Sequence, residues 1–314
     1  RLLSRGLGDV YKRQNLICPD AVVFNFSNPM QRICHAVTTK FPDLRFIGLC
    51  HEIKSMNRQL PDLMETEMHN IEYRAAGLNH LSILLEARYK NTGKDGYPII
   101  KQNFDAYFSD LVNKHDAKPS KPGAERGVFR KLFKTYGYLP ITTDSHLGEY
   151  IQWAYSVADH DAILDFYDNY KEKCLAFYDN KTSYDHFFDL KNLDTHERVV
   201  PIIEGILSDS AYEEPAINIP NNGYIEFLPK DIVVEVPGII NKSGISGISF
   251  KNYPAAFGTL LNSQSGVIQM TTDAVLNASK HSAYLALLAD PVVNDSYQAE
   301  KLLNNMLETQ GKFL

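Results

Sequence analysis

Two short segments of this 314-residue chain carry residues that can bind a transition metal. Gly48-Leu49-Cys50 and Gly77-Leu78-Asn79-His80 each follow an apolar run with the composition of a β-strand. A thiolate and an imidazole that are delivered from two strand ends can share one ion. If Cys50 and His80 do so, their sulfur and nitrogen must lie within about 6 Å of each other.

Each of these residues also has a purely structural interpretation. A single cysteine is more often part of the hydrophobic core than a metal ligand. A single histidine is more often a hydrogen-bonded structural residue. Asp144, in Thr143-Asp144-Ser145-His146, would serve equally well as the N-cap of a following helix. The chemical interpretation therefore depends on the surrounding sequence.

The elements that must position these residues begin near the amino terminus. Strands are predicted over residues 20–26 and 44–49, with a helix over residues 31–40 between them. Strand, helix and strand within about thirty residues are typical of the βαβ unit of a parallel sheet. Ligands of such sheets bind at the carboxyl ends of the strands, which is where Asn28 and Cys50 lie.

The later sequence mixes helices with short strands. One long strand is predicted over residues 71–89, and a hairpin turn at Asn222-Gly223 is predicted to join strands 216–219 and 224–228. Residues 114–123 are predicted to form a mobile loop. Helices are predicted over residues 52–67, 99–114, 124–136, 146–156, 162–178, 198–208, 255–289 and 295–309.

Composition excludes several classes of protein. The net charge of −6, without a lysine and arginine cluster, argues against nucleic acid and anionic membranes as partners. No apolar run approaches the roughly 20 residues of a membrane span. Four cysteines in 314 residues are too few for a disulfide scaffold, so a cytoplasmic location is expected.

Several motifs in one order give the sequence its most specific signal. Asn25-Phe26-Ser27-Asn28-Pro29-Met30, Gly48-Leu49-Cys50-His51 and Gly77-Leu78-Asn79-His80 follow one another at 22- and 30-residue intervals from Asn28 to Cys50 to His80. Together with residues 218–223, 234–237 and 278–292 they resemble glycoside hydrolase family 4, whose members are NAD- and manganese-dependent glycosidases. The resemblance extends from residue 19 to the last predicted helix.

The resemblance implies an α/β fold: a remnant of a Rossmann-like dinucleotide-binding domain followed by an α+β substrate domain like that of lactate and malate dehydrogenases. Residues 15–52 would end the first domain and residues 53–314 would form the second, which would also carry the contacts of a homodimer or homotetramer. Residues 1–14 do not fit this pattern and are expected to be a non-native tract, so the chain is expected to be a carboxy-terminal piece.

The resemblance also implies a reaction. NAD would take a hydride from C3 of the sugar, and a base would remove the proton at C2. A divalent cation would stabilise the charge on the C2 and C3 oxygens. The aglycone would then leave C1, water would add, and the hydride would return.

Mapped onto this chain, the resemblance makes Cys50 and His80 the ligands of Mn²⁺. The donor types alone also admit zinc, iron or cobalt. Asn28 and Asn79 would bind sugar hydroxyls, and Asn25 would join Asn28 near the nicotinamide of NAD.

Two residues compete for the role of C2 base. Asp144 is the first choice, and Tyr138 is the alternative. His51 would assist the leaving group or support the metal ligands. Because relatives that act on 6-phosphorylated sugars carry aspartate directly after the cysteine, His51 predicts a non-phosphorylated α-galactoside, α-glucoside or α-galacturonide.

Two other classes of function stay open at this point. One is an NAD-dependent 2-hydroxy-acid dehydrogenase, which shares the fold but has no use for Cys50. The other is a non-catalytic fragment, because the chain shows no glycine-rich phosphate loop between a strand and a helix. Gly6-Leu7-Gly8 lacks that context.

Overall fold

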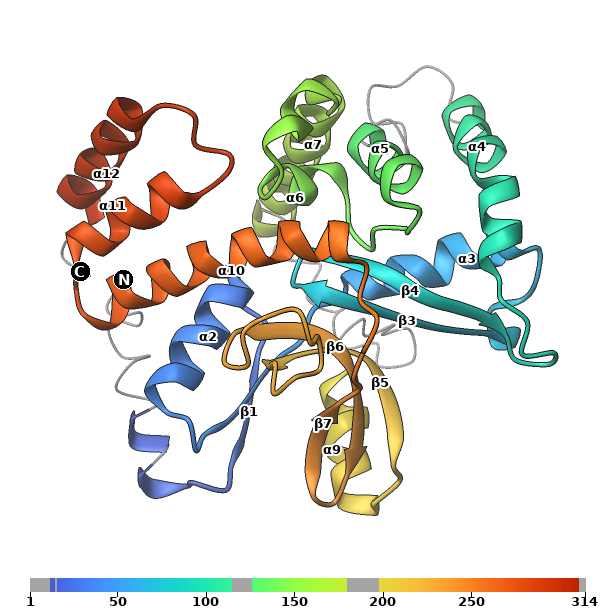
Figure 1. Cartoon of the computed structure of the whole chain (residues 1–314), viewed down its shortest axis with the longest axis horizontal. Helices are drawn as coiled ribbons and strands as arrows, with labels where there is room; N and C mark the ends of the chain where they lie inside the picture. The colour runs from blue at the N-terminus through green and yellow to red at the C-terminus, as the bar shows by residue number, and fades with distance from the viewer. Residues whose placement is uncertain (1–11, 15, 115–125, 180–197, 311–314) are drawn as a thin grey trace.

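A single mixed sheet organises the chain (Figure 1). The computed structural model describes residues 12–14, 16–114, 126–179 and 198–310. The strand order is β1-β2-β5-β6-β3-β4, and β7 pairs with β6. The strands are β1 Val22–Asn25, β2 Arg45–Gly48, β3 Ile71–Leu78, β4 Leu81–Tyr89, β5 Tyr212–Pro220, β6 Val233–Asn241 and β7 Gly244–Gly247.

The predicted βαβ unit is present at the start of this sheet. Strands β1 and β2 are parallel, and helix α2 (Met30–Lys40) connects them. Strand β2 then pairs with β5 in the antiparallel sense, so the parallel unit and the later antiparallel strands form one continuous sheet. The carboxyl end of β2 therefore lies beside β5, a strand from the second half of the chain.

The prediction of one long strand over residues 71–89 is wrong in one respect. The segment folds back on itself at Asn79 and His80. Strands β3 and β4 form an antiparallel hairpin in which Leu78 faces Leu81. Alternation of apolar residues continues through the turn, so the pattern alone did not reveal the break. Gly77 is required here, since a Cβ atom at that position would lie 2.4 Å from the carbonyl oxygen of Leu81.

The hairpin predicted around Asn222-Gly223 is also wrong. Both residues do form a turn, with positive φ angles of 44° and 90°. However, residues 224–228 form no strand, and β5 pairs with β6 instead. The buried amide of Asn221 holds the intervening loop by donating to the carbonyl oxygens of Ile225, Leu228 and Pro229.

Most predicted helices are present, and two are interrupted. Residues 255–289 form α10 and α11, separated at Ala278 with its φ of 49°, and Ser279 caps α11. Residues 146–156 form α6 and the short helix η4. The helices are η1 Glu52–Ser55, α3 Met56–Met64, η2 Met68–Asn70, α4 Tyr97–Lys114, α5 Gly127–Tyr136, α6 Asp144–Gly148, η4 Gln152–Ser156, α7 His160–Asp179, α9 Val199–Ser208, α10 Ala255–Leu276, α11 Lys280–Ala289 and α12 Ser296–Gln310.

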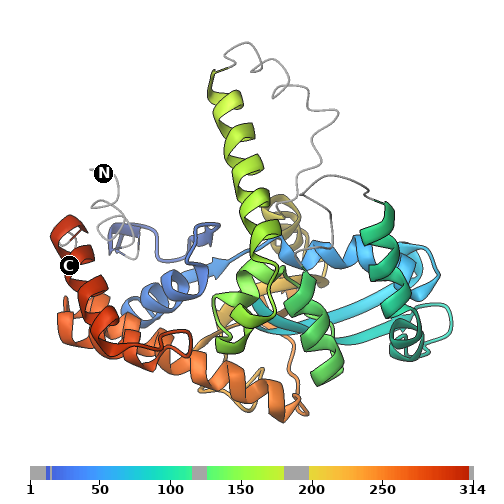
Figure 2. The same ribbon diagram turned by 90° about the horizontal axis from the view of Figure 1, so that it is seen from above.

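Helices on both sides of the sheet enclose the core. Helix α3 buries Met56, Leu60, Leu63 and Met64, which recur on one helical face. Helix α10 packs against α2, and α7 projects from the body (Figure 2). In the described part of the chain, no helix is long and apolar enough to span a bilayer. The loop predicted from residue 114 lies almost wholly outside the described residues.

Candidate active site

The structure brings Cys50 and His80 together. Their Sγ and Nε2 atoms are 3.5 Å apart. An ion bound at about 2.3 Å from a thiolate and about 2.1 Å from an imidazole separates these two atoms by about 3.1–3.6 Å at ligand angles of about 90–110°. We call this pair of residues the Cys–His corner. The observed separation of 3.5 Å lies within the range expected for two ligands of one cation.

Burial shapes the chemistry of the corner. It raises the pKa of the Cys50 thiol to about 12, with a further contribution from the negative charge of Glu235. Burial likewise lowers the pKa of His80 to about 4, with a contribution from His146. The imidazole is therefore neutral near pH 7, as a metal ligand must be, whereas the thiol has to lose a proton when it binds an ion.

The hairpin turn fixes the position of His80. His80 is buried, and its backbone is in the left-handed region with a φ of 61°. This conformation costs about 1–3 kcal/mol for a residue other than glycine and is maintained only by surrounding structure. The close approach at Gly77 and the β3–β4 pairing provide that structure.

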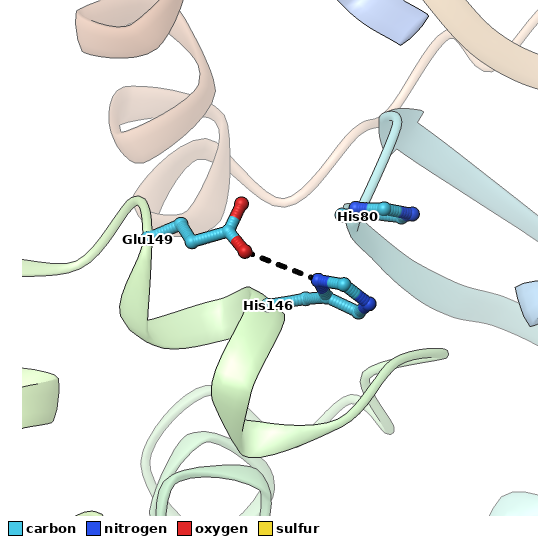
Figure 3. A group of neighbouring side chains, drawn as sticks. All are labelled: His80, His146 and Glu149. Atoms are coloured by element: carbon cyan, nitrogen blue, oxygen red, sulfur yellow. Dashed lines mark hydrogen bonds and ion pairs between the residues drawn. The ribbon is translucent and has the colours of Figure 1, made fainter. Parts of the chain in front are cut away.

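A second histidine packs directly on the first (Figure 3). The rings of His80 and His146 are stacked, with centroids 3.9 Å apart and planes inclined by 25°. Nδ1 of His146 lies 3.2 Å from Oε1 of Glu149. Burial alone would lower the pKa of His146, but the hydrogen bond to Glu149 and the charges of Glu52 and Glu149 raise it overall.

One donor atom each from His80, His146 and Glu149 lie within 4.8 Å of one another. A ligand lone pair lies in the plane of its imidazole ring. Two nearly parallel rings at this spacing cannot both direct a lone pair at one ion about 2.1 Å away. In this arrangement His146 therefore supports the ring of His80 instead of sharing an ion with it.

Removal of the His146 ring is expected to weaken metal binding at the corner. The variant His146→Ala leaves one face of His80 unsupported, and His146→Phe keeps a ring in contact. Loss of an outer partner of a ligating histidine typically lowers metal affinity about tenfold or more. We expect about a tenfold higher dissociation constant for His146→Ala and a smaller change for His146→Phe, measured by calorimetric titration with Mn²⁺. Equal affinity in both variants and the unsubstituted chain would contradict this role.

The three predicted asparagines have different surroundings. Asn28 is exposed after β1, and its side chain accepts a hydrogen bond from the Met30 amide. Asn25 is buried and uses its side chain to hold the turn at Ser27. Asn79 is also buried and donates to the carboxylate of Glu235. Asn28 is thus the only one of the three that the structure presents to solvent.

His51 lies next to the Cys–His corner, whereas Tyr138 lies far from it. The side chain of His51 is 60% exposed beside Cys50, 3.9 Å from Glu52. Tyr138 packs edge-on against Tyr97 and lines a separate cavity of about 460 Å³. The segment that follows it pairs with β4 so that Tyr138 lies near the level of Leu85, about 17 Å along the strand from His80. The structure therefore does not bring Tyr138 to the Cys–His corner.

Asp144 is completely buried, and backbone N–H groups bind its carboxylate. Its Oδ2 and Oδ1 atoms accept hydrogen bonds from the amides of Val128 and Phe129 at 2.8 and 2.9 Å. These are free amides in the first turn of α5, whose own N-cap residue, Arg126, makes no side-chain cap. The capping interpretation therefore fits Asp144 better than the role of C2 base, although the helix it caps is α5 and not its own.

Sequence reasoning missed four polar residues around the corner, namely Glu52, His146, Glu149 and Glu235. Glu52 accepts a hydrogen bond from Thr142 and is near enough for its charge to act on His80 and His146. The three-residue spacing of His146 and Glu149 places them on one helical face, and this spacing could have identified them as a pair. A second signal was a single acidic residue, Glu235, within the apolar run of β6.

The fold and these contacts define an α/β protein with a polar site where the parallel strands β1 and β2 end, the edge at which such sheets bind ligands. The chain belongs to family 4 of the glycosyl hydrolases. It matches the family 4 glycosyl hydrolase model over residues 5–66 and the model of the family's C-terminal domain over residues 75–293. This family is one of glycoside hydrolases, which removes the 2-hydroxy-acid dehydrogenase alternative.

Individual relatives agree with this membership. The chain is 41% identical to an alpha-glucosidase of Erwinia rhapontici over 95% of this chain and 69% of that protein. It is 28% identical to an alpha-galactosidase of Bacillus subtilis over 91% of this chain and 64% of that protein. The chain thus spans about two thirds of the length of these relatives.

A solved structure shares the fold. It is a 6-phospho-alpha-glucosidase from gut microorganisms in complex with NAD and Mn²⁺, which superposes with a TM-score of 0.76 at 18% identity. The match covers 98% of this chain and 71% of that one. The predicted Rossmann-like α/β fold class is confirmed.

Proposed function

We propose that this chain belongs to a glycosidase that hydrolyses non-phosphorylated α-glycosides with NAD and a divalent cation. The observation that carries the proposal is the 3.5 Å separation of Cys50 Sγ and His80 Nε2, which follow the ends of β2 and β3. The 41% identity to an alpha-glucosidase favours an α-glucoside as substrate over an α-galactoside or α-galacturonide. His51, which stands where phosphosugar enzymes of the family carry aspartate, supports a substrate without a phosphate.

The residues of the corner fit the cation. A neutral imidazole and a thiol that can ionise supply two of its ligands, and the sugar oxygens and water would supply others. The presence of Mn²⁺ in the solved relative supports manganese over the softer ions that thiolate ligation alone would favour. When bound, NAD would accept the C3 hydride and the cation would stabilise negative charge on the C2 and C3 oxygens.

The remaining residues would bind and orient the sugar. The exposed amide of Asn28, three residues after the end of β1, is available for hydrogen bonds to sugar hydroxyls. The exposed imidazole of His51 can donate a proton to the leaving oxygen at C1. Asn25 and Asn79 would act through the turns that they hold, because their side chains already bind protein groups.

The cofactor requirement provides the direct test. Hydrolysis of nitrophenyl α-glucoside, α-galactoside and α-galacturonide would be measured in the full-length protein, with NAD and Mn²⁺ each present or removed by gel filtration and chelation. We expect the α-glucoside to be cleaved fastest, and omission of either cofactor to lower the rate by about a thousandfold or more. Hydrolysis that persists without NAD would refute the proposed reaction.

A further inference from the structure

Glu235 is a carboxylate in a strand that is otherwise apolar. Its side chain lies in β6, between β5 and β3, and the residue is 2% exposed. Burial of an ionised carboxylate costs several kcal/mol unless hydrogen bonds or opposite charges offset it. A carboxylate at this position therefore needs a compensating arrangement and a reason to be there.

Three neutral donors surround the Glu235 carboxylate. Asn79 Nδ2 lies 2.8 Å from Oε2, and Asn218 Nδ2 lies 3.1 Å from the same atom. Ser82 Oγ lies 2.9 Å from Oε1. We call these four residues the carboxylate hub. Its members come from the β3–β4 turn and from strands β4, β5 and β6, so the hub ties four parts of the sheet together.

The carboxylate hub contacts the segments that carry both residues of the Cys–His corner. Asn79 directly precedes His80 in the turn, and its side chain acts against burial by lowering the pKa of the Cys50 thiol. Asn218 Nδ2 lies 3.4 Å from the carbonyl oxygen of Gly48, two residues before Cys50. Movement of the Glu235 carboxylate would therefore be transmitted to each of the two ligands.

The charge of Glu235 distinguishes the hub from an ordinary structural network. Burial raises the pKa of the Glu235 carboxyl, and the hydrogen bonds from Asn79, Asn218 and Ser82 act in the opposite direction. In its ionised form the carboxylate places a negative charge next to the corner that the neutral donors do not cancel. This charge opposes a thiolate at Cys50 as long as no cation is nearby. A divalent cation at the corner would be attracted by the same charge, and the low-dielectric surroundings would strengthen that attraction.

We propose that Glu235 is the positioning residue of the Cys–His corner. Through Asn79 and Asn218 it holds Cys50 Sγ and His80 Nε2 at a separation that suits one divalent cation, and its charge increases the affinity for that cation. This inference rests on the proposed function, because it takes the corner as the cation site.

Titration of the 314-residue chain with Co²⁺ tests the inference without any need for catalysis. A cobalt–thiolate charge-transfer band in the near ultraviolet reports ligation by Cys50 directly. The variant Glu235→Gln keeps the size of the side chain and removes its charge. We expect its Co²⁺ dissociation constant to rise about 10- to 100-fold, the usual effect of changing an outer partner of metal ligands.

A matched control is available in the neighbouring strand. Glu214 in β5 is equally buried, and Arg198 binds its carboxylate. The variant Glu214→Gln is expected to bind Co²⁺ as the unsubstituted chain does. Circular dichroism would verify that each variant is folded. If Glu235→Gln does not fold, Asn79→Ser, which leaves Glu235 with its other two donors, is expected to raise the dissociation constant about tenfold.

The possible results separate the inference from the proposed function. If the unsubstituted chain gives no band that depends on Cys50, the corner is not a cation site and both proposals fail. If it gives the band but folded Glu235→Gln, or Asn79→Ser in its place, binds Co²⁺ with unchanged affinity, only the positioning role of Glu235 is overturned.

Discussion

Replacement of Cys50 by serine is expected to lower the metal-dependent glycosidase activity of the full-length enzyme by about a thousandfold. Loss of one of two protein ligands weakens the binding of the cation, which would stabilise the negative charge formed on the C2 and C3 oxygens. Such a cation contributes several kcal/mol, and about 4 kcal/mol corresponds to a factor of a thousand in rate. The rate would be measured with a nitrophenyl α-glucoside at saturating NAD and Mn²⁺.

The matched control for this variant is Cys174→Ser. Cys174 is a free, partly exposed cysteine on α7, which carries none of the candidate site residues. Its replacement is expected to leave the rate unchanged, and thermal denaturation should show that both variants are folded. Full activity of Cys50→Ser under these conditions would remove Cys50 from the site.

Replacement of Asp144 by asparagine is expected to destabilise the protein by about 2 kcal/mol. The asparagine side chain can accept a hydrogen bond from only one of the two α5 backbone N–H groups. It turns its own NH₂ group toward the other. A lost cap costs about 0.5–2 kcal/mol, and hydrogen bonds to a charged acceptor are worth about 1.5–3 kcal/mol. Urea denaturation measures the change as a shift in the unfolding midpoint.

The same variant separates the two interpretations of Asp144. The exposed Asp168 on α7 provides a control, since Asp168→Asn should change neither stability nor rate. If Asp144 only caps α5, the folded Asp144→Asn enzyme should keep its kcat within about fivefold. Unchanged stability with a loss of kcat of about a thousandfold would instead identify Asp144 as the base.

Local patterns predicted the parts of the protein that depend on neighbours in sequence. The strand, helix and strand of β1, α2 and β2 follow from their periodicity, and the structure contains all three. The ends of long apolar runs were harder to predict, as the turn at His80 shows. A two-residue reversal leaves the alternation of apolar side chains intact, and only the close approach at Gly77 and the pairing partner decide where the strand folds back.

The sequence by itself determined the family, the order of its motifs and the choice of Cys50 and His80 as candidate ligands. The tertiary structure alone decided what surrounds them. Asn79 and Glu235 are 156 residues apart in the chain yet 2.8 Å apart in the sheet. Asp144 lies 15 and 16 positions after the two amides it caps. Hydrogen-bond partners at such separations follow from strand order and helix packing, which no local pattern of side chains encodes.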